Sequence, residues 1–215
     1  RLGDLAYSRV HTRSAMDCRL AIAATSPTEL AAALAGAAGG QLPASVVRGQ
    51  VGSAAPGRVI FVFPGQGSQW LGMGRGLLAE EQVFRAAMTA CDRAIHNEAG
   101  FSVLAELAAD EESSQLQRVD VVQPVLFALG VALSALWRSW GVVPDVVVGH
   151  SLGEVAAAHV AGALSLEDAV AIICRRSRLL RRISGQGAMA LVELPLGQAL
   201  SELAEYPDRL SVAVS

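Results

Sequence analysis

The 215-residue sequence is poor in cysteine, has no excess of basic residues and lacks a long hydrophobic run. Its three cysteines, Cys18, Cys91 and Cys174, are odd in number and are not spaced as metal ligands, so we expect no metal site and a reducing, cytoplasmic location. The net charge of −3 gives no reason to expect nucleic acid or an anionic membrane as a partner. The longest apolar run, residues 124–137, is too short to span a bilayer and predicts a buried core helix.

No signal peptide is recognisable in the sequence. The first residue is Arg1 rather than methionine, and the last residues, 210–214, resemble a β-strand, so we expect a piece of a longer protein. Hydrophobic residues make up 52% of the chain. This content is sufficient for a buried core in one large domain or two small ones.

A Gly-rich loop, Pro-Gly-Gln-Gly-Ser-Gln at 64–69, directly follows an apolar strand predicted at 59–63. The dinucleotide-binding fingerprint is absent because Trp70 stands where its third glycine would fall. The Gly-Lys-Ser/Thr of a Walker loop is absent too. The loop is therefore either a simple tight turn or a segment that offers accessible backbone N–H groups to a ligand.

The most informative stretch is Val-Val-Val-Gly-His-Ser-Leu-Gly-Glu at 146–154. A β-branched run that ends in Gly-x-Ser-x-Gly and continues into an Ala-rich helical pattern is typical of a nucleophile elbow. Ser151 would be the nucleophile, held in a cramped backbone conformation at a helix N-terminus. Gly149 and Gly153 are required there because side chains would collide with the neighbouring strand and helix. The alternative is an ordinary capping box formed by Ser151 and Glu154.

An enzyme with such an elbow needs two N–H donors for the oxyanion of its tetrahedral intermediate. The first strand-to-helix loop commonly supplies one donor, and the residue after the nucleophile supplies the other. We therefore expect the backbone N–H groups of Gln66 and Leu152 to form the oxyanion hole.

Helical geometry singles out Arg176 in the helix predicted at 165–183. At 100° per residue, a set of apolar residues lies within roughly 60° of Arg176. These are Ala169, Ile172, Ile173, Leu179, Leu180 and Ile183. A buried guanidinium needs an anionic partner, either an internal Asp or Glu or a substrate carboxylate gripped by two N–H bonds. The other arginines, Arg175, Arg178, Arg181 and Arg182, would form a solvated face or a basic patch for a partner.

Gln123 precedes Pro124, which suits the first turn of a helix that runs to about residue 140. The polar side chain of Gln123 would then lie at the mouth of this helix and face an apolar interior. It is either a helix cap or a hydrogen-bonding group of an active site.

The sequence divides into three units. Residues 1–57 form a small unit in which a capping box at Ser26 and Glu29 starts a helix, and Gly, Ser and Pro are concentrated at 41–57. Residues 58–186 form an α/β unit, and residues 187–215 begin a β-α-β lobe. The further elements predicted are strands at 18–24, 45–47, 189–194 and 210–214, and helices at 31–38, 77–98 and 197–205.

The motifs at 64–69 and 149–154, together with Arg176, resemble those of malonyl-CoA:acyl carrier protein transacylases, and most closely the acyltransferase domain of a modular type I polyketide synthase. Residues 1–57 resemble the linker that joins a ketosynthase to such a domain. The resemblance implies an α/β-hydrolase-like parallel sheet at 58–186 and the start of a ferredoxin-like subdomain at 187–215. It makes Ser151 the nucleophile and Arg176 the carboxylate-binding residue, with Gln66 and Leu152 at the oxyanion hole. Gln123 and His150 match residues beside the site.

The resemblance also implies a reaction and partners. An extender unit would pass from malonyl- or methylmalonyl-CoA through an acyl-serine to the phosphopantetheine arm of an acyl carrier protein, with no bound cofactor and with an adjacent ketosynthase domain. The motif Arg-Val-Asp-Val-Val-Gln at 118–123 resembles the methylmalonyl-selecting version, whereas Leu152 resembles the malonyl-selecting one. We favour methylmalonyl.

The catalytic histidine of this family lies downstream of residue 215. Of the histidines present, His11, His96, His150 and His159, none is a convincing general base, and His159 is expected to be packed. The chain alone is therefore predicted to be inactive. Two other functions remain open, a lipase- or thioesterase-like serine hydrolase and a non-catalytic docking fragment.

Overall fold

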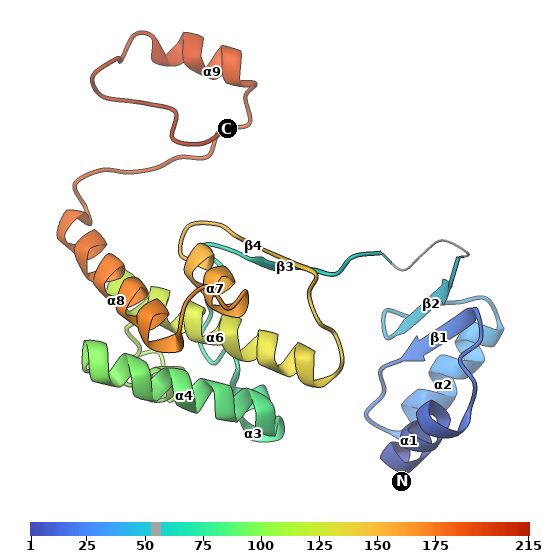
Figure 1. Ribbon diagram of the computed structural model, residues 1–215. Helices are drawn as coiled ribbons and strands as arrows, with labels where there is room; N and C mark the ends of the chain where they lie inside the picture. Colours follow the sequence, from blue (N-terminus) through green and yellow to red (C-terminus); the bar gives the residue numbers. More distant parts are fainter. Residues whose placement is uncertain (53–56) are drawn as a thin grey trace. The chain divides into compact units, whose positions relative to one another are not determined.

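The computed structural model describes residues 1–52 and 57–215, which form two compact units, Arg1–Gly57 and Arg58–Ser215 (Figure 1). Each unit contains its own two-stranded sheet. The connection predicted at 41–57 begins with a loop and a strand, and its residues 53–56 lie outside the described residues.

In its described residues, 1–52 and 57, the first unit contains two helices and an antiparallel strand pair. β1 (Cys18–Ile22) pairs with β2 (Val46–Gln50). α2 (Pro27–Ala38) starts at the predicted capping box, where Ser26 Oγ accepts from the N–H of Glu29 at 3.2 Å and Glu29 Oε2 accepts from the N–H of Thr25 at 2.8 Å. The sequence gives no sign of α1 (Leu2–Thr12), which has no side-chain cap and buries none of its residues.

The second unit has the predicted α/β class, with a parallel strand pair packed on helices. Its central helix, α6, packs against α4, α7 and α8, and α7 also contacts both strands (Figure 1). The elements are β3 (Ile60–Phe63), α3 (Arg75–Glu80), α4 (Gln82–Ala99), α5 (Val103–Ala108), α6 (Val119–Ser139), β4 (Val146–Gly149), α7 (Gly153–Val160), α8 (Leu166–Ile183) and α9 (Leu196–Leu203).

The parallel register of β3 and β4 decides where the two motifs meet. Phe63 lies opposite Gly149, so both strands end at the same edge of the sheet. The N–H of His150 donates to the carbonyl oxygen of Phe63 at 3.0 Å and extends the ladder into the elbow. The loop at 64–69 and the elbow therefore leave the sheet side by side.

Each of these strands buries one face only, which corrects the prediction that the strand at 59–63 is buried throughout. Phe63 is buried and Phe61 packs against the core, whereas Ile60 and Val62 are 54% and 67% exposed. The inward face lies on the helices, because the ring of Phe63 is so close to Gly130 of α6 that an added Cβ would lie 3.3 Å from it.

α6 is the predicted core helix, but it begins at Val119 and is 21 residues long. Pro124 therefore lies inside the helix and not in its first turn. The start is earlier because the N–H groups of Val121 and Val122 donate to the carbonyl of Arg118. Among the described residues, α6 is the one helix whose length and apolar composition would suffice to cross a membrane, and more than half of its apolar window is buried in the core.

The helix predicted at 77–98 is in fact two helices, α3 and α4, with a break at Glu81. The guanidinium of Arg85 donates to the carbonyls of Leu78 and Ala79, and so satisfies two carbonyls at the end of α3. Periodicity does not reveal this break, because the apolar residues of both helices pack against the same core, with Leu77 and Leu78 of α3 partly buried and the core residues of α4 fully buried.

Residues 187–215 contain the predicted helix as α9, but neither of the predicted strands. Residues 189–194 and 210–214 pair with no other strand in the part of the chain that the structure describes. Met189 and Leu191 are 94% and 97% exposed. A strand requires a partner for its N–H and C=O groups, so an apolar alternating sequence alone does not make one.

Candidate active site

Ser151 stands on a strained turn between β4 and α7. Its φ is +56°, the one positive φ of a non-glycine residue among the described residues. Such a conformation costs energy and is kept only where the surrounding structure imposes it. The turn leaves Ser151 exposed at the edge of the sheet.

Steric contact explains the two glycines that flank the turn. A Cβ on Gly149 would lie 2.4 Å from Cα of Glu154, inside the helix. A Cβ on Gly153 would lie 2.1 Å from the carbonyl oxygen of Phe63, on the neighbouring strand. The predicted collisions with helix and strand are both present, and the capping-box alternative is not, because the N-cap of α7 is Leu152 and no side chain caps it.

The side chain of Arg176 links the nucleophile to α6. Its Nη2 donates to Ser151 Oγ at 3.0 Å, and its Nη1 donates to Gln123 Oε1 at 2.7 Å. Gln123 Nε2 in turn donates to Gln66 Oε1 at 3.4 Å. These four side chains come from the elbow, α8, α6 and the loop after β3, and they form one hydrogen-bonded chain. Gln123, buried on α6, is thus a hydrogen-bonding group of the site and not a helix cap.

The prediction that Arg176 lies on the buried face of α8 is confirmed only in part, since Ala169 and Ile173 beside it are buried. Arg176 is half-buried, and Ile172, Leu179 and Ile183 are 43%, 55% and 59% exposed. The buried face is displaced to one side of Arg176, because α4, α6 and α7 pack there. It consists of Ala169, Val170, Ile173, Cys174 and Ser177.

No carboxylate pairs with Arg176 in the described residues, which argues against the internal salt bridge that the sequence left open. Its partners are a hydroxyl and an amide oxygen, both neutral. The positive charge is therefore not paired with a carboxylate in the part of the chain that the structure describes. An anion close to Ser151 would find a guanidinium already oriented toward it.

The other arginines of α8 were predicted to form either a solvated face or a basic patch, but two of them bind α4. Arg175 forms an ion pair with Glu98 at 2.9 Å, and Arg178 Nη2 donates to the backbone carbonyl of Glu98 at 3.2 Å. The C-terminal end of α4 attracts these cations, since its last carbonyls have no intrahelical partner. The hydrogen bond from Arg175 holds the pKa of the Glu98 carboxyl below its ordinary value.

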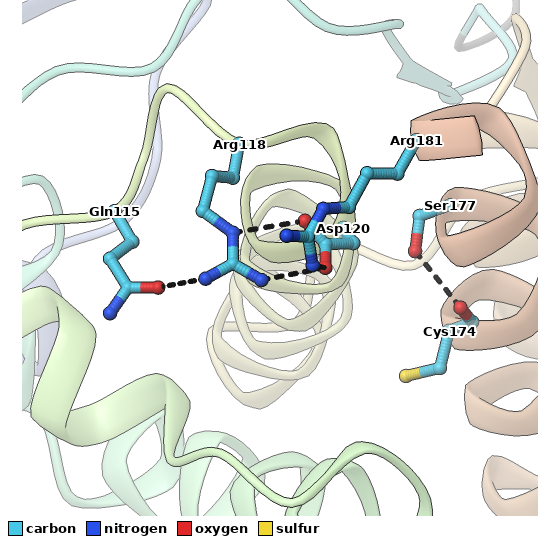
Figure 2. Close-up of polar contacts among 6 residues, drawn as sticks. All are labelled: Gln115, Arg118, Asp120, Cys174, Ser177 and Arg181. Carbon is cyan, nitrogen blue, oxygen red and sulfur yellow. Dashed lines mark hydrogen bonds and ion pairs between the residues drawn. The ribbon is translucent and has the colours of Figure 1, made fainter. Parts of the chain in front are cut away.

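Asp120 pairs with two arginines, a feature that periodicity did not reveal (Figure 2). It accepts from Arg118 at 2.8 Å and from Arg181 at 2.9 Å. The hydrogen bond from Arg118, and to a smaller extent that from Arg181, holds the pKa of the Asp120 carboxyl below its ordinary value. The sequence held one hint of this pairing. Asp120 lies close to Gln123 on α6, and Arg181 lies close to Arg176 on α8.

The backbone N–H groups of Gln66 and Leu152 remain the expected oxyanion donors. Within residues 1–52 and 57–215, neither is used in a hydrogen bond to another group of the chain. The loop is bent back on itself, because the N–H of Gly67 donates to Gln69 Oε1 at 2.9 Å. Its backbone also lies against the elbow, since a Cβ on Gly65 would come within 3.0 Å of His150 Nδ1.

The histidines and cysteines offer no second catalytic pair in the described residues. His159 Nδ1 lies 3.1 Å from the carbonyl oxygen of Leu164 beside Phe127, so the expectation that it is packed is confirmed. No histidine there is hydrogen-bonded to Ser151, and no group of three or more His, Cys, Asp or Glu could hold a metal ion. Burial raises the pKa of Cys91 and of Cys174 to about 12, which keeps both thiols protonated and unreactive.

The steric role of Gly153 leads to a stability prediction. Gly153→Ala would force a methyl group into backbone atoms of Phe63 and Pro64, which cannot rotate away as a side chain could. We expect it to lower the free energy of unfolding by about 3 kcal/mol or more, measured by urea unfolding followed by circular dichroism. Gly76→Ala is the matched control, because a Cβ there meets nothing within 4 Å. Equal stabilities of the two variants would contradict the tight strand-to-helix packing.

A serine on a strained elbow, two unused N–H groups and an unneutralised arginine are the arrangement of an enzyme that transfers acyl groups through a serine ester. The family model for the acyl transferase domain matches residues 60–215, and the chain belongs to that family.

Its relatives are polyketide synthases. Polyketide synthase GfsA of Streptomyces halstedii is 48% identical over 210 residues, which are 98% of this chain and 3% of that protein. The crystal structure of the acyltransferase domain from module 8 of the salinomycin polyketide synthase superposes with a TM-score of 0.89 at 37% identity, over 99% of this chain and 50% of that one. The malonyl-CoA:ACP transacylase of Synechocystis sp. PCC 6803 gives a TM-score of 0.59 at 34% identity, over 69% of this chain and 48% of that one. The chain thus spans about half the length of these solved acyltransferases.

Proposed function

We propose that this chain is the first part of an acyltransferase domain that loads a malonyl-type extender unit onto an acyl carrier protein during polyketide synthesis in the cytoplasm. The observation that supports this most is the position of Arg176, whose guanidinium donates to Ser151 Oγ and has no carboxylate partner in the described residues. A hydrolase for simple esters has no use for such a charge. An enzyme for diacid thioesters requires it.

The reaction proceeds in two half-reactions through Ser151. Ser151 Oγ attacks the thioester carbonyl carbon and gives its proton to a histidine that we place beyond residue 215. The negative charge on the carbonyl oxygen is stabilised by the N–H groups of Gln66 and Leu152. The C–S bond then breaks, and coenzyme A leaves with that proton.

The second half-reaction runs the same steps in reverse with a different thiol. The phosphopantetheine thiol of the carrier protein loses its proton to the histidine and attacks the acyl-serine carbonyl. The C–O bond to Ser151 breaks, and the hydroxyl regains a proton. No bound cofactor is needed, because coenzyme A and phosphopantetheine enter as parts of the substrate and the partner.

Arg176 would select diacid units by binding their free carboxylate. The two bonds it already makes, to Ser151 and Gln123, orient its planar fork before the substrate arrives. An acyl group without a carboxylate would leave the guanidinium unpaired and desolvated, which disfavours that substrate. Gln123 acts here by fixing one Nη, and His150 forms the wall beside the nucleophile.

The half-length match supports a continuation of the domain past residue 215, which would supply the histidine. It would also cover the exposed apolar face of β3 and β4, where Ile60 and Val62 lie. In this proposal residues 1–57 are the linker from a preceding ketosynthase, 58–186 are part of the large subdomain, and 187–215 begin the ferredoxin-like subdomain. We propose methylmalonyl as the extender unit because of the motif at 118–123. Leu152 instead favours malonyl, which is the alternative.

Acylation with three thioesters tests the proposal. The complete domain, extended past residue 215, should acquire methylmalonyl and malonyl groups on Ser151, with methylmalonyl faster and acetyl at least about a hundredfold slower. Intact-protein mass spectrometry after brief incubation with each CoA ester measures this. The 215-residue chain should label far more slowly, since it lacks the base.

Each alternative predicts a different result. Equal labelling by acetyl and the diacids, followed by hydrolysis instead of transfer to a carrier, would favour a serine hydrolase. No labelling of the complete domain by any thioester would favour a docking fragment. Turnover by the 215-residue chain at the rate of the complete domain would contradict the missing base.

A further inference from the structure

Asp120 joins the beginning of α6 to α8 through Arg181, and its carboxylate also binds Arg118, the residue just before α6 (Figure 2). Its Oδ2 accepts from Arg118 Nη2 at 2.8 Å and from Arg181 Nη1 at 2.9 Å, and its Oδ1 accepts from Arg118 Nε at 3.2 Å. We call these three residues the Asp120 bridge. The carboxylate is 14% exposed, so it is mostly shielded from water.

The bridge lies next to the site along both helices. Asp120 precedes Gln123 by three residues on α6, which places the two on the same face about one turn, roughly 5 Å, apart. Arg181 follows Arg176 by five residues on α8. The Asp120 bridge and the bond between Arg176 and Gln123 are therefore two successive polar connections between the same pair of helices.

The hydrogen bonds of Arg176 require a definite position of α6 relative to α8, and the Asp120 bridge can fix that position. The bond from Arg176 Nη1 to Gln123 Oε1 is 2.7 Å long, and that from Nη2 to Ser151 Oγ is 3.0 Å long. Both follow from how the first turns of α6 are seated on α8, because the backbone of each helix is rigid. A small shift of α6 would release Arg176 into its many rotamers, and ordering it again on binding would cost affinity.

Stability alone is a weak explanation of the Asp120 bridge. Arg118 and Arg181 are 42% and 56% exposed, and ion pairs that involve exposed side chains contribute little. The α6 and α8 helices are already held together by buried apolar residues such as Val122, Val125 and Ile173. The contrasting pair between Arg175 and Glu98 joins α8 to α4, which carries no residue of the site.

We propose that Asp120 is a positioning residue, which seats the first turns of α6 on α8 through Arg181 and so keeps Arg176 aimed at Ser151 and at the substrate carboxylate. This inference rests on the proposed function, because its consequence appears in the binding of the diacid. Asp120 touches neither Ser151 nor the expected oxyanion donors, so it acts on substrate binding and not on the chemical step.

The test compares Asp120→Asn with the wild type in the complete acyltransferase polypeptide. Asparagine keeps the size but removes the charge that both arginines bind. We expect the KM for methylmalonyl-CoA to rise about tenfold with kcat changed less than about twofold, and the slow acylation by acetyl-CoA to be unchanged. Steady-state transfer to the carrier protein and the single-turnover rate of acetylation are the two measurements.

Glu98→Gln is the matched control, because it removes the other ion pair of α8 without touching α6. Glu98→Gln should lower the Tm about as much as Asp120→Asn does, but it should leave the KM for methylmalonyl-CoA unchanged. Arg181→Gln, at a more exposed position, should raise the KM in the same direction, and the double variant should be no worse than Asp120→Asn alone. Arg181→Gln alone also tests the inference if Asp120→Asn does not fold.

Three results would overturn the inference while leaving the proposed function intact. They are a wild-type KM in both single variants, a parallel loss of acetylation, and fully additive effects in the double variant. A wild-type protein that discriminates in no way between acetyl- and methylmalonyl-CoA would instead remove the proposed function itself.

Discussion

Ser151→Ala is expected to abolish acyl transfer, with a rate at least about 10⁴-fold below that of the wild type. The reaction needs an oxygen that forms an ester, and Ser151 Oγ is the hydroxyl that Arg176 contacts at the end of β4. The N–H groups and the guanidinium would remain, so the variant should still bind the thioester. Intact mass spectrometry should show no acyl adduct, and no charged carrier protein should form.

A glycine at the same position separates catalysis from folding. The φ of +56° at Ser151 costs a residue with a Cβ about 1 kcal/mol, and glycine adopts it without penalty. Ser151→Gly should therefore be as inactive as Ser151→Ala but more stable than the wild type in urea unfolding. Retained acylation of Ser151→Ala would refute its role as nucleophile, and a less stable Ser151→Gly would refute the strain.

Arg176→Ala is expected to lower kcat/KM for methylmalonyl-CoA by about 10³-fold, while acylation by acetyl-CoA stays the same or improves. The substrate carboxylate would lose its partner, whereas an acetyl group has none to lose. Arg176→Lys should lower this value by only about 10- to 100-fold, because it keeps the charge but replaces the planar fork, whose two Nη atoms bind Gln123 and Ser151 separately, with a single nitrogen. The measurement is the ratio of kcat/KM values for the two thioesters in each variant.

The neighbouring Arg175 supplies the control for Arg176. Its guanidinium is turned away to Glu98 of α4, so Arg175→Ala should change the ratio less than about twofold. An unchanged ratio in Arg176→Ala, or an equal change in Arg175→Ala, would show that Arg176 does not recognise the carboxylate.

The elbow is the part of the site that the sequence predicts best. Its requirements are local, namely a β-branched strand, glycines where Cβ atoms would strike backbone within five residues or on the adjacent strand, and a helix behind. The helical projection around Arg176 is confirmed only in part. The apolar residues around it predicted burial, but part of that face is exposed, and its actual feature is the bond to a serine 25 residues away.

The strands and surface arginines show the limit of local patterns. Residues 189–194 and 210–214 alternate like strands, yet they pair with no other strand in the described part of the chain, because a ladder requires a second segment at the correct distance. Arg181 and Arg175 looked solvated on a helical projection. Their partners Asp120 and Glu98 are 61 and 77 residues away, on helices whose packing the projection does not include.

By itself, the sequence determined the local elements: the caps, the apolar core helix α6, the strained turn at Ser151 and the loop after β3. Periodicity, steric exclusion and backbone hydrogen bonding act over a few residues, so they can be read from a linear chain. Only the tertiary structure decided that Gln66, Gln123, Ser151 and Arg176 share one hydrogen-bonded chain and that Asp120 pairs with Arg181 beside it. The bonds of this hydrogen-bonded chain depend on how α6, α8 and the two strands pack, and their lengths of 2.7 to 3.4 Å are set by contacts between segments 25 to 57 residues apart.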